Sequence, residues 1–203
     1  MTNSDNTSYF DRLRSYTVLF NNDVTIISNQ IFDNLPQFRY WSGSGKPEHH
    51  HYGYNGLARH TLEVYELMAN SSKTLNLDVR LDLIYLAALF HDVGKLWDYE
   101  RSVEHVMQNH RAIAMGDWIK SKHARNIHHI SRSALVWSKA VDSTGLFREE
   151  HDEVLHAILA HHGQREWGSP VAPNSKLAWL LHLCDGISAR MDDCDKIDLA
   201  GVK

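Results

Sequence analysis

The chain has 203 residues, of which 43% are hydrophobic and 23% are charged, and its formal net charge at pH 7 is −4. This length and composition suit one globular domain with a hydrophobic core of its own. The acidic balance excludes a broad basic surface, which argues against a long, tightly bound nucleic-acid polymer but not against a small or single-stranded substrate.

The two cysteines, Cys184 and Cys194, cannot form the disulfide framework of a small secreted protein. The first residues, MTNSDNTSYF, lack the basic region and apolar run of a signal peptide. No segment approaches the run of about 18 apolar residues that a membrane span requires. We therefore expect a cytoplasmic protein that does not enter a membrane.

Helical periodicity dominates the first part of the chain. Apolar residues at helical spacing predict a helix over 22–34 that ends before Pro36. Glycines and prolines make 36–55 a loop. A second helix is expected over 56–75, with Asn55 as its N-cap.

The segment DVRLDLIYLAALF is almost wholly apolar after its first residue. It predicts a buried central helix over 79–90, capped by Asp78 and ended by Gly94 in a left-handed turn. No convincing alternating run is present, so strands should be absent or minor, and no repeat or linker divides the chain. The prediction is a single all-α domain with further helices over 103–122, 126–142, 149–162 and 174–191 and a loop over 163–173.

Histidine is in excess, with 15 residues spread through the chain, and imidazole is the commonest ligand of transition metals. A lone histidine on a half-buried helix is more often a hydrogen-bonded core residue than a ligand. Asp185 lies within the apolar segment AWLLHLCDGI, where a carboxylate is costly unless it is paired or bound to a metal. The candidate ligands, all at helix ends or on helix faces, are His60, His91, Asp92, His129, His161, His162 and Asp185.

Imidazoles and carboxylates without thiolates suit Mn, Fe, Co, Ni, Zn or Mg better than a structural zinc. One group of candidates, His60, His91, Asp92 and Asp185, suffices for one divalent ion. The remaining histidines indicate a second ion about 3.5–4 Å away, with Asp92 bridging the two. Lys95 follows Asp92 by one turn and either neutralises charge on phosphoryl oxygens or only stabilises the end of the helix.

In the order H…HD…H…HH…D, these residues resemble the HD superfamily of metal-dependent phosphohydrolases. Within it the chain looks most like the HD domain of YhaM-type 3′–5′ exoribonucleases. The resemblance implies an HD-domain helical bundle over 36–195, preceded by a helical extension over 1–35 and followed by a tail over 196–203. It is carried by HHYGYNGLARHTLEV (50–64), AALFHDVGK (87–95), HHISRSALV (128–136), LAHHGQREWGSPVAP (159–173) and LLHLCDGISARM (180–191).

The resemblance implies that Asp92 and Lys95 act in catalysis and that the seven candidate ligands hold the metal ions. The assignment of His129 to a ligand position of the family is the least direct, because the stretch between Lys95 and His129 is longer than expected. His105 or His110 is the alternative ligand. The chain departs from the family in two places. Its first motif follows only about 50 residues, too few for the N-terminal OB-fold, and Ser188 stands where a second aspartate is usual.

Two loops and the last helix contain candidate substrate-binding residues. Aromatic rings could stack a base, and arginines could contact a phosphate. Loop aromatics equally often seal the edge of a core, so each residue has a purely structural interpretation. The candidates are His50, His51, Tyr54, Arg59, Trp167, Ser169 and Arg190.

Three hypotheses about function follow. The chain is a phosphohydrolase acting on phosphodiester bonds of short RNA or DNA, as a 3′–5′ exonuclease does; or a phosphohydrolase of mononucleotides, dNTPs or cyclic and signalling nucleotides; or an inactive HD binding module. The third is disfavoured because no candidate ligand is missing. The expected partner is a nucleotide or a short single-stranded nucleic acid, and exposed helix faces permit a homodimer.

Overall fold

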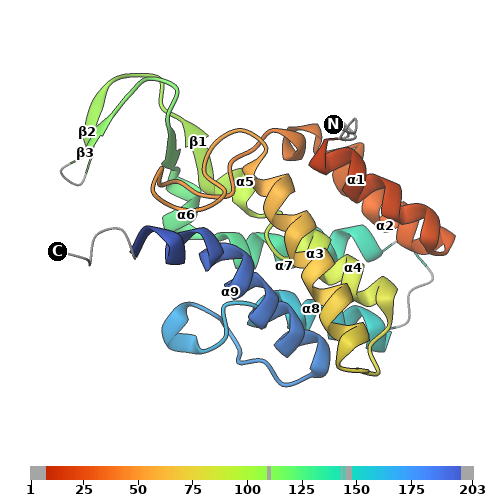
Figure 1. Ribbon diagram of the computed structural model, residues 1–203. Coiled ribbons are helices and arrows are strands. Elements are labelled where there is room, and N and C mark those ends of the chain that lie inside the picture. The colour runs from red at the N-terminus through yellow and green to blue at the C-terminus, as the bar shows by residue number, and fades with distance from the viewer. Residues whose placement is uncertain (1–7, 109–110, 143, 145–147, 198–203) are drawn as a thin grey trace, which may run out of the picture.

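A computed structural model describes residues 8–108, 111–142, 144 and 148–197, which form a helical body with a small β-hairpin extension (Figure 1). The all-α prediction is confirmed. The helices are α1 (Tyr9–Ser15), α2 (Asn22–Phe32), α3 (Gly56–Thr74), α4 (Leu81–Phe90), α5 (Lys95–Asp98), α6 (Lys122–Asn126), α7 (His129–Val141), α8 (Arg148–Ala160) and α9 (Lys176–Ile197), with 3-10 turns η1 (Tyr16–Leu19), η2 (Pro36–Arg39) and η3 (Arg165–Trp167).

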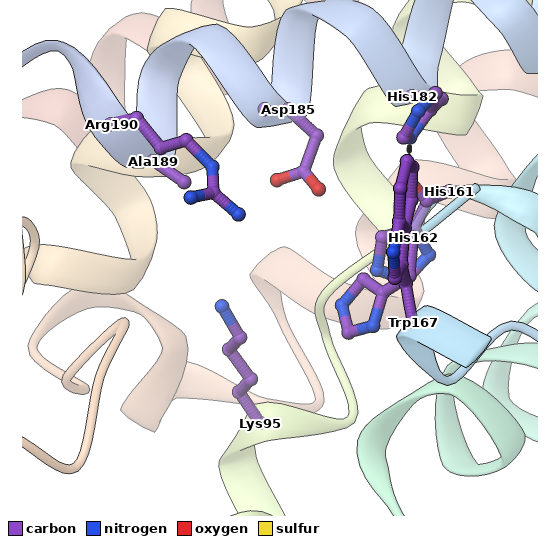
Figure 2. A pocket seen from close by; sticks show the side chains of 9 residues that line it. Lys95, His161, His162, Trp167, His182, Asp185, Ala189 and Arg190 are labelled. Atoms are coloured by element: carbon purple, nitrogen blue, oxygen red, sulfur yellow. Dashed lines mark hydrogen bonds between the residues drawn. The ribbon is translucent and has the colours of Figure 1, made fainter. Parts of the chain in front are cut away.

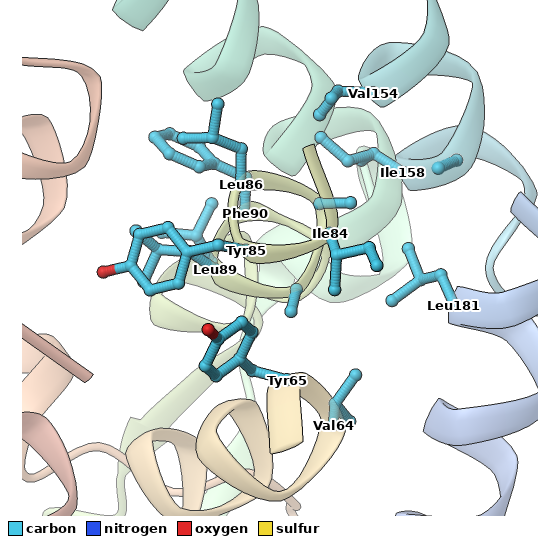
Figure 3. Close-up of a cluster of buried hydrophobic side chains, with 14 of the residues drawn as sticks. Val64, Tyr65, Ile84, Tyr85, Leu86, Leu89, Phe90, Val154, Ile158 and Leu181 are labelled. Atoms are coloured by element: carbon cyan, nitrogen blue, oxygen red, sulfur yellow. The ribbon is translucent and has the colours of Figure 1, made fainter. Parts of the chain in front are cut away.

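Helix α4 forms the centre of the core because its sequence is apolar on every face, as predicted. Every residue from 83 to 90 is buried, and burial of each large side chain contributes about 1.5–3 kcal/mol. Figure 3 shows α4 surrounded by Tyr65 of α3, Val154 and Ile158 of α8, and Leu181 of α9. The elements that flank α4 are those that carry the candidate ligands, so packing on α4 brings the ligands together.

One of the two predicted helix caps is confirmed in position and the other is wrong. Asn55 is the N-cap residue of α3, but with φ of 65° its side chain makes no capping hydrogen bond. Helix α4 begins at Leu81 with Arg80 as the N-cap residue, so Asp78 lies outside the helix end. Asp82 in the first turn accepts a hydrogen bond from the Leu83 amide instead, which satisfies one of the unpaired donors of that turn.

The prediction of a left-handed turn at Gly94 is also wrong, because its φ is −61°. A glycine is required there for space and not for conformation. A Cβ at Gly94 would overlap the backbone carbonyl of His129. The turn after α4 therefore lies directly against the start of α7.

In the described part of 103–122, which leaves out 109 and 110, short antiparallel strands stand where a helix was predicted. Strand β1 (Tyr99–Arg101) pairs with β4 (Trp118–Lys120), and β2 (Val106–Gln108) pairs with β3 (Arg111–Ile113). They extend away from the helical body (Figure 1). Trp118 is 2% exposed and its ring packs on Trp41 at 4.6 Å. This long-range contact anchors β4, and local helical propensity does not reveal it.

Among the residues that the structure describes, no helix combines the length and the apolar character needed to cross a membrane.

Candidate metal centre

The predicted ligands converge at one end of the core from five elements. His60 lies on α3, His91 and Asp92 follow α4, and Asp185 lies on α9; their ligand atoms all lie within 4.8 Å of one another. His129 at the start of α7 and the pair His161 and His162 after α8 form a second group within the same limit. Two clusters of lone-pair donors thus lie side by side.

Asp92 lies between the two clusters and directs one carboxylate oxygen to each. Its Oδ2 is 3.3 Å from His60 Nε2 and 3.4 Å from His91 Nε2. Its Oδ1 is 3.4 Å from His129 Nε2 and 3.6 Å from His161 Nε2. This is the arrangement expected of a bridging carboxylate in a two-metal site.

The second nitrogen of three ligand histidines is held by a hydrogen-bond acceptor. Nδ1 of His91 lies 2.8 Å from the Ala88 carbonyl, and Nδ1 of His161 lies 2.6 Å from the Ile158 carbonyl. Nδ1 of His129 lies 3.1 Å from a carboxylate oxygen of Asp98. Carbonyls and carboxylates only accept, so Nδ1 carries the proton and Nε2 turns its lone pair toward the centre.

The donor set fits divalent cations. His60 Nε2 lies 3.2 Å from His91 Nε2, and His129 Nε2 lies 3.3 Å from His162 Nε2. Paired lone pairs at these distances repel unless a positive charge lies between them. Asp92 Oδ1 and His161 Nε2 are buried without a hydrogen-bond partner, which is costly unless another group binds them.

Electrostatics keep most of these side chains in the protonation states that metal ions need. Burial raises the pKa of Asp92, but Lys95 and His91 outweigh it and hold that pKa well below its usual range. Burial lowers the pKa of His129 to about 4 and that of His162 to about 2. An ionised carboxylate and neutral imidazoles are the forms that bind metals.

His129, His105 and His110 were the three candidates for one ligand of the second ion, and the structure distinguishes between His129 and His105. His129 lies in the second cluster. His105 is exposed and lines a separate surface pocket near β3, together with Met107 and Asp117. His110 lies outside the described residues.

A cavity of about 600 Å³ opens beside the two clusters. Figure 2 shows Lys95, Asp185 and Arg190 on one side of it and aromatic rings on the other. The cavity therefore offers positively charged side chains to an anionic part of a ligand and flat rings to an aromatic or apolar part. Its lining residues are Lys95, His161, His162, Trp167, His182, Asp185, Gly186, Ala189 and Arg190.

Of the predicted substrate-binding residues, Trp167 and Arg190 line this cavity, and the other five do not. His51 Nε2 lies 2.7 Å from Glu63, and Arg59 Nε donates to Glu63 at 2.7 Å. The remaining three also lie away from the cavity lining: His50 beside the ring of His51, Tyr54 stacked on Tyr40, and Ser169 buried.

Sequence reasoning missed His182 and Asp98. His182 Nδ1 donates to the His161 carbonyl at 2.8 Å, and its ring stacks on Trp167 at 6.0 Å. It precedes Asp185 by three residues on α9, so helical spacing could have placed both on one face. Asp98 Oδ2 accepts from the His129 backbone amide at 3.0 Å and contacts the His129 ring. Its position one turn after Lys95 was the available signal.

A centre of histidines and aspartates from several packed helices defines a class of helical domain, and the comparisons agree with it. The HD domain model matches residues 57–190, and the chain belongs to the HD domain family.

Within that family, the chain is similar to the 3′-5′ exoribonuclease YhaM of a Geobacillus species, with 31% identity over 149 residues, which are 73% of this chain and 42% of the relative. The enzymes of the same name from Bacillus pumilus and Listeria monocytogenes match equally, over 43% of their length. The chain therefore spans less than half of the length of these relatives. No solved structure matches it.

Proposed function

We propose that the chain is a metal-dependent phosphohydrolase that cleaves phosphodiester bonds in short RNA or DNA, working from the 3′ end. One observation supports the proposal most directly. Asp92 directs its two carboxylate oxygens to two separate groups of imidazoles, and these groups lie beside a cavity lined by the positively charged side chains of Lys95 and Arg190. The similarity to exoribonucleases supports the nucleic-acid substrate.

In this proposal His60, His91, Asp92 and Asp185 hold one divalent ion. The second is held by His129, His161 and His162, with Asp92 shared between them. Ions held by these residues would supply Lewis-acid chemistry: they would lower the pKa of a water molecule toward about 7 and withdraw charge from the phosphate oxygens. The histidines and carboxylates orient this centre through the hydrogen bonds on their outer sides.

Lys95 supports the chemistry as a fixed cation. Its Nζ lies 2.6 Å from Asp92 Oδ2, and its side chain lines the cavity. Burial lowers the pKa of Lys95, but Asp92 outweighs burial and raises that pKa above its ordinary value. A lysine that stays protonated can neutralise charge that develops on the phosphoryl oxygens. Arg190, which faces Lys95 across the open space in Figure 2, orients the phosphate.

The aromatic side of the cavity is proposed to receive the base. Trp167 is 61% exposed and stacks on His182, so one face of its ring is supported and the other is accessible. Stacking of a base on an aromatic side chain contributes about 1–3 kcal/mol and tolerates any sequence. The cavity thus accommodates a terminal nucleotide with its phosphate between Lys95 and Arg190.

The cavity volume favours a second candidate. A space of about 600 Å³ is typical of small-ligand sites, and the net charge of −4 does not favour a long polymer. Hydrolysis of mononucleotides, dNTPs or cyclic and signalling nucleotides is therefore the alternative.

The experiment is a substrate screen with the Mn²⁺-loaded protein. Oligonucleotides labelled at the 5′ end, mononucleotides, dNTPs, cyclic nucleotides and bis-p-nitrophenyl phosphate are compared, with the Asp92→Ala variant as control. Stepwise shortening from the 3′ end, absent in the variant, is the expected result. Turnover of mononucleotides or cyclic nucleotides alone would establish the alternative, and equal activity in the variant would refute both.

A further inference from the structure

A third cluster of titratable side chains lies beside the metal centre, around Glu63 on α3. Glu63 Oε2 lies 2.7 Å from His51 Nε2 and 2.9 Å from Ser188 Oγ, while Oε1 accepts from Arg59 Nε at 2.7 Å. His50, His51 and Glu63 have the spacing of a metal site. A guanidinium already bound to the same carboxylate repels a cation, so this cluster serves another purpose.

Ser188 connects Glu63 to the metal centre. Its hydroxyl has one proton, and the ionised Glu63 can only accept, so Ser188 donates to Glu63 Oε2. The Ser188 oxygen is then free to accept from His60 Nδ1, which lies 3.1 Å away. This order of donors places the proton of His60 on Nδ1 and turns its Nε2 toward Asp92 and Asp185, at 3.3 and 3.1 Å.

We propose that Glu63 is the positioning carboxylate of the metal ligand His60 and that it acts through the hydroxyl of Ser188. The proposal rests on the proposed function in assigning an ion to His60. The second cluster uses a shorter version of the same device, since Asp98 contacts His129 Nδ1 directly. Carboxylates that hold the outer nitrogen of a ligating histidine fix its tautomer and ring orientation.

The loop before α3 holds Glu63 in place. The carbonyl of His51 accepts from the Gly43 amide at 2.9 Å, and a Cβ at Gly56 would overlap that carbonyl. His51 has φ of 64° and is 7% exposed. The loop is therefore pressed against the first turn of α3, with the His51 ring directed at Glu63. In this interpretation the loop orients a ligand and does not contact substrate.

The test is calorimetric titration of the metal-stripped full chain with Mn²⁺. Ser188→Ala removes the connection and is expected to weaken the His60 site about 10–100-fold. Ser28→Ala is the matched control, because Ser28 is a fully buried helical serine that donates to the Val24 carbonyl and belongs to neither ligand cluster. It should bind Mn²⁺ as the wild type does. Circular dichroism and thermal unfolding monitor the fold.

A second pair of variants separates positioning from packing. Glu63→Gln keeps the shape of the side chain but removes its charge, and it should weaken the same site even if Ser188→Ala does not fold. Adding Ser188→Asp to Glu63→Gln places a carboxylate directly on His60 Nδ1 and should restore affinity. A merely structural role predicts no such rescue.

The outcomes are distinguishable. If the wild type binds Mn²⁺ tightly and both Ser188→Ala and Glu63→Gln bind it with the same affinity, the positioning role of Glu63 is refuted, but the metal centre is not. No Mn²⁺ binding by the wild type refutes the metal centre and, with it, the positioning role. Weakened binding without rescue by the double variant also contradicts the proposal.

Discussion

Gly94 lies in backbone contact with His129, and a Cβ on the glycine would overlap the His129 carbonyl oxygen. The Gly94 amide also donates to Ser133 Oγ on α7 at 2.9 Å. These contacts set how closely the turn carrying Asp92 approaches the helix carrying His129. The 3.4 Å distance between Asp92 Oδ1 and His129 Nε2 depends on that approach.

Gly94→Ala should therefore separate the two clusters. Overpacking against a backbone atom typically costs about 1–3 kcal/mol, and the second metal position should weaken as α7 moves away. Urea unfolding and Mn²⁺ titration measure the two effects. Gly186→Ala is the stability control, because a Cβ there meets nothing within 4 Å. Unchanged stability and metal binding in Gly94→Ala would contradict the role of this contact.

His129→Ala and His105→Ala test which histidine completes the second cluster. His129 is buried among the other ligands, whereas His105 is exposed near a separate pocket. We expect His129→Ala to reduce the metal content measured by mass spectrometry from two ions per chain to one. His105→Ala should leave the content unchanged. Loss of one ion in His105→Ala but not in His129→Ala would make His105 the ligand instead.

Lys95→Met should lower kcat far more than it raises KM. The lysine lies against Asp92 and lines the cavity, so its charge acts on the phosphoryl oxygens mainly in the transition state. Steady-state kinetics on the substrate identified by the screen measure both constants. An unchanged kcat would limit Lys95 to stabilising the end of α4 and the following turn.

Trp167→Ala should raise KM for an oligonucleotide about 5–150-fold, which corresponds to the loss of about 1–3 kcal/mol of base stacking. An oligonucleotide with an abasic 3′ end serves as the control, since it has no ring to stack. The variant and the wild type should then differ little. An equal loss on both substrates would assign Trp167 a structural role in the loop after α8.

The metal-free protein should lose stability as the pH falls from 6.5 to 5. Burial holds the folded-state pKa of several histidines below the unfolded value of about 6.5, so the unfolded chain takes up protons first. Carboxylate contacts outweigh burial and raise the pKa of His60 and His161, and the stability that these two contribute is already present below pH 6.5 and does not change on further acidification. The larger group has lowered pKa values: about 4 for His51 and His129, about 2 for His162, and a downward shift for His91 and His128.

Below the unfolded pKa, each histidine of the lowered group contributes a slope that approaches about 1.4 kcal/mol per pH unit until its folded-state pKa is reached. Urea unfolding in the presence of a chelator, repeated at several pH values, measures it. Stability that is constant or that rises on acidification would mean that the buried imidazoles are already protonated in the folded chain.

Helices α2 and α3 were predictable from apolar residues at helical spacing and α4 from a continuous apolar run, because both patterns are local properties of the chain. Prediction was wrong over 103–122, where the anchor is the contact of Trp118 with Trp41 and not a local pattern. The capping error at Asp78 has a related cause. Several polar residues can cap a helix start, and the approach of the preceding loop decides which one lies there.

The sequence by itself determined the helical class and the residue types of the centre, because histidines and aspartates at the ends of apolar helices are a local signal. Only the tertiary structure decided how these residues are used. It placed His50, His51 and Arg59 around Glu63 and brought His182 to the cavity. It also brought Ser188 to His60 across 128 positions of the chain. Hydrogen-bond partners depend on which segments pack together, and that packing is a property of the whole core.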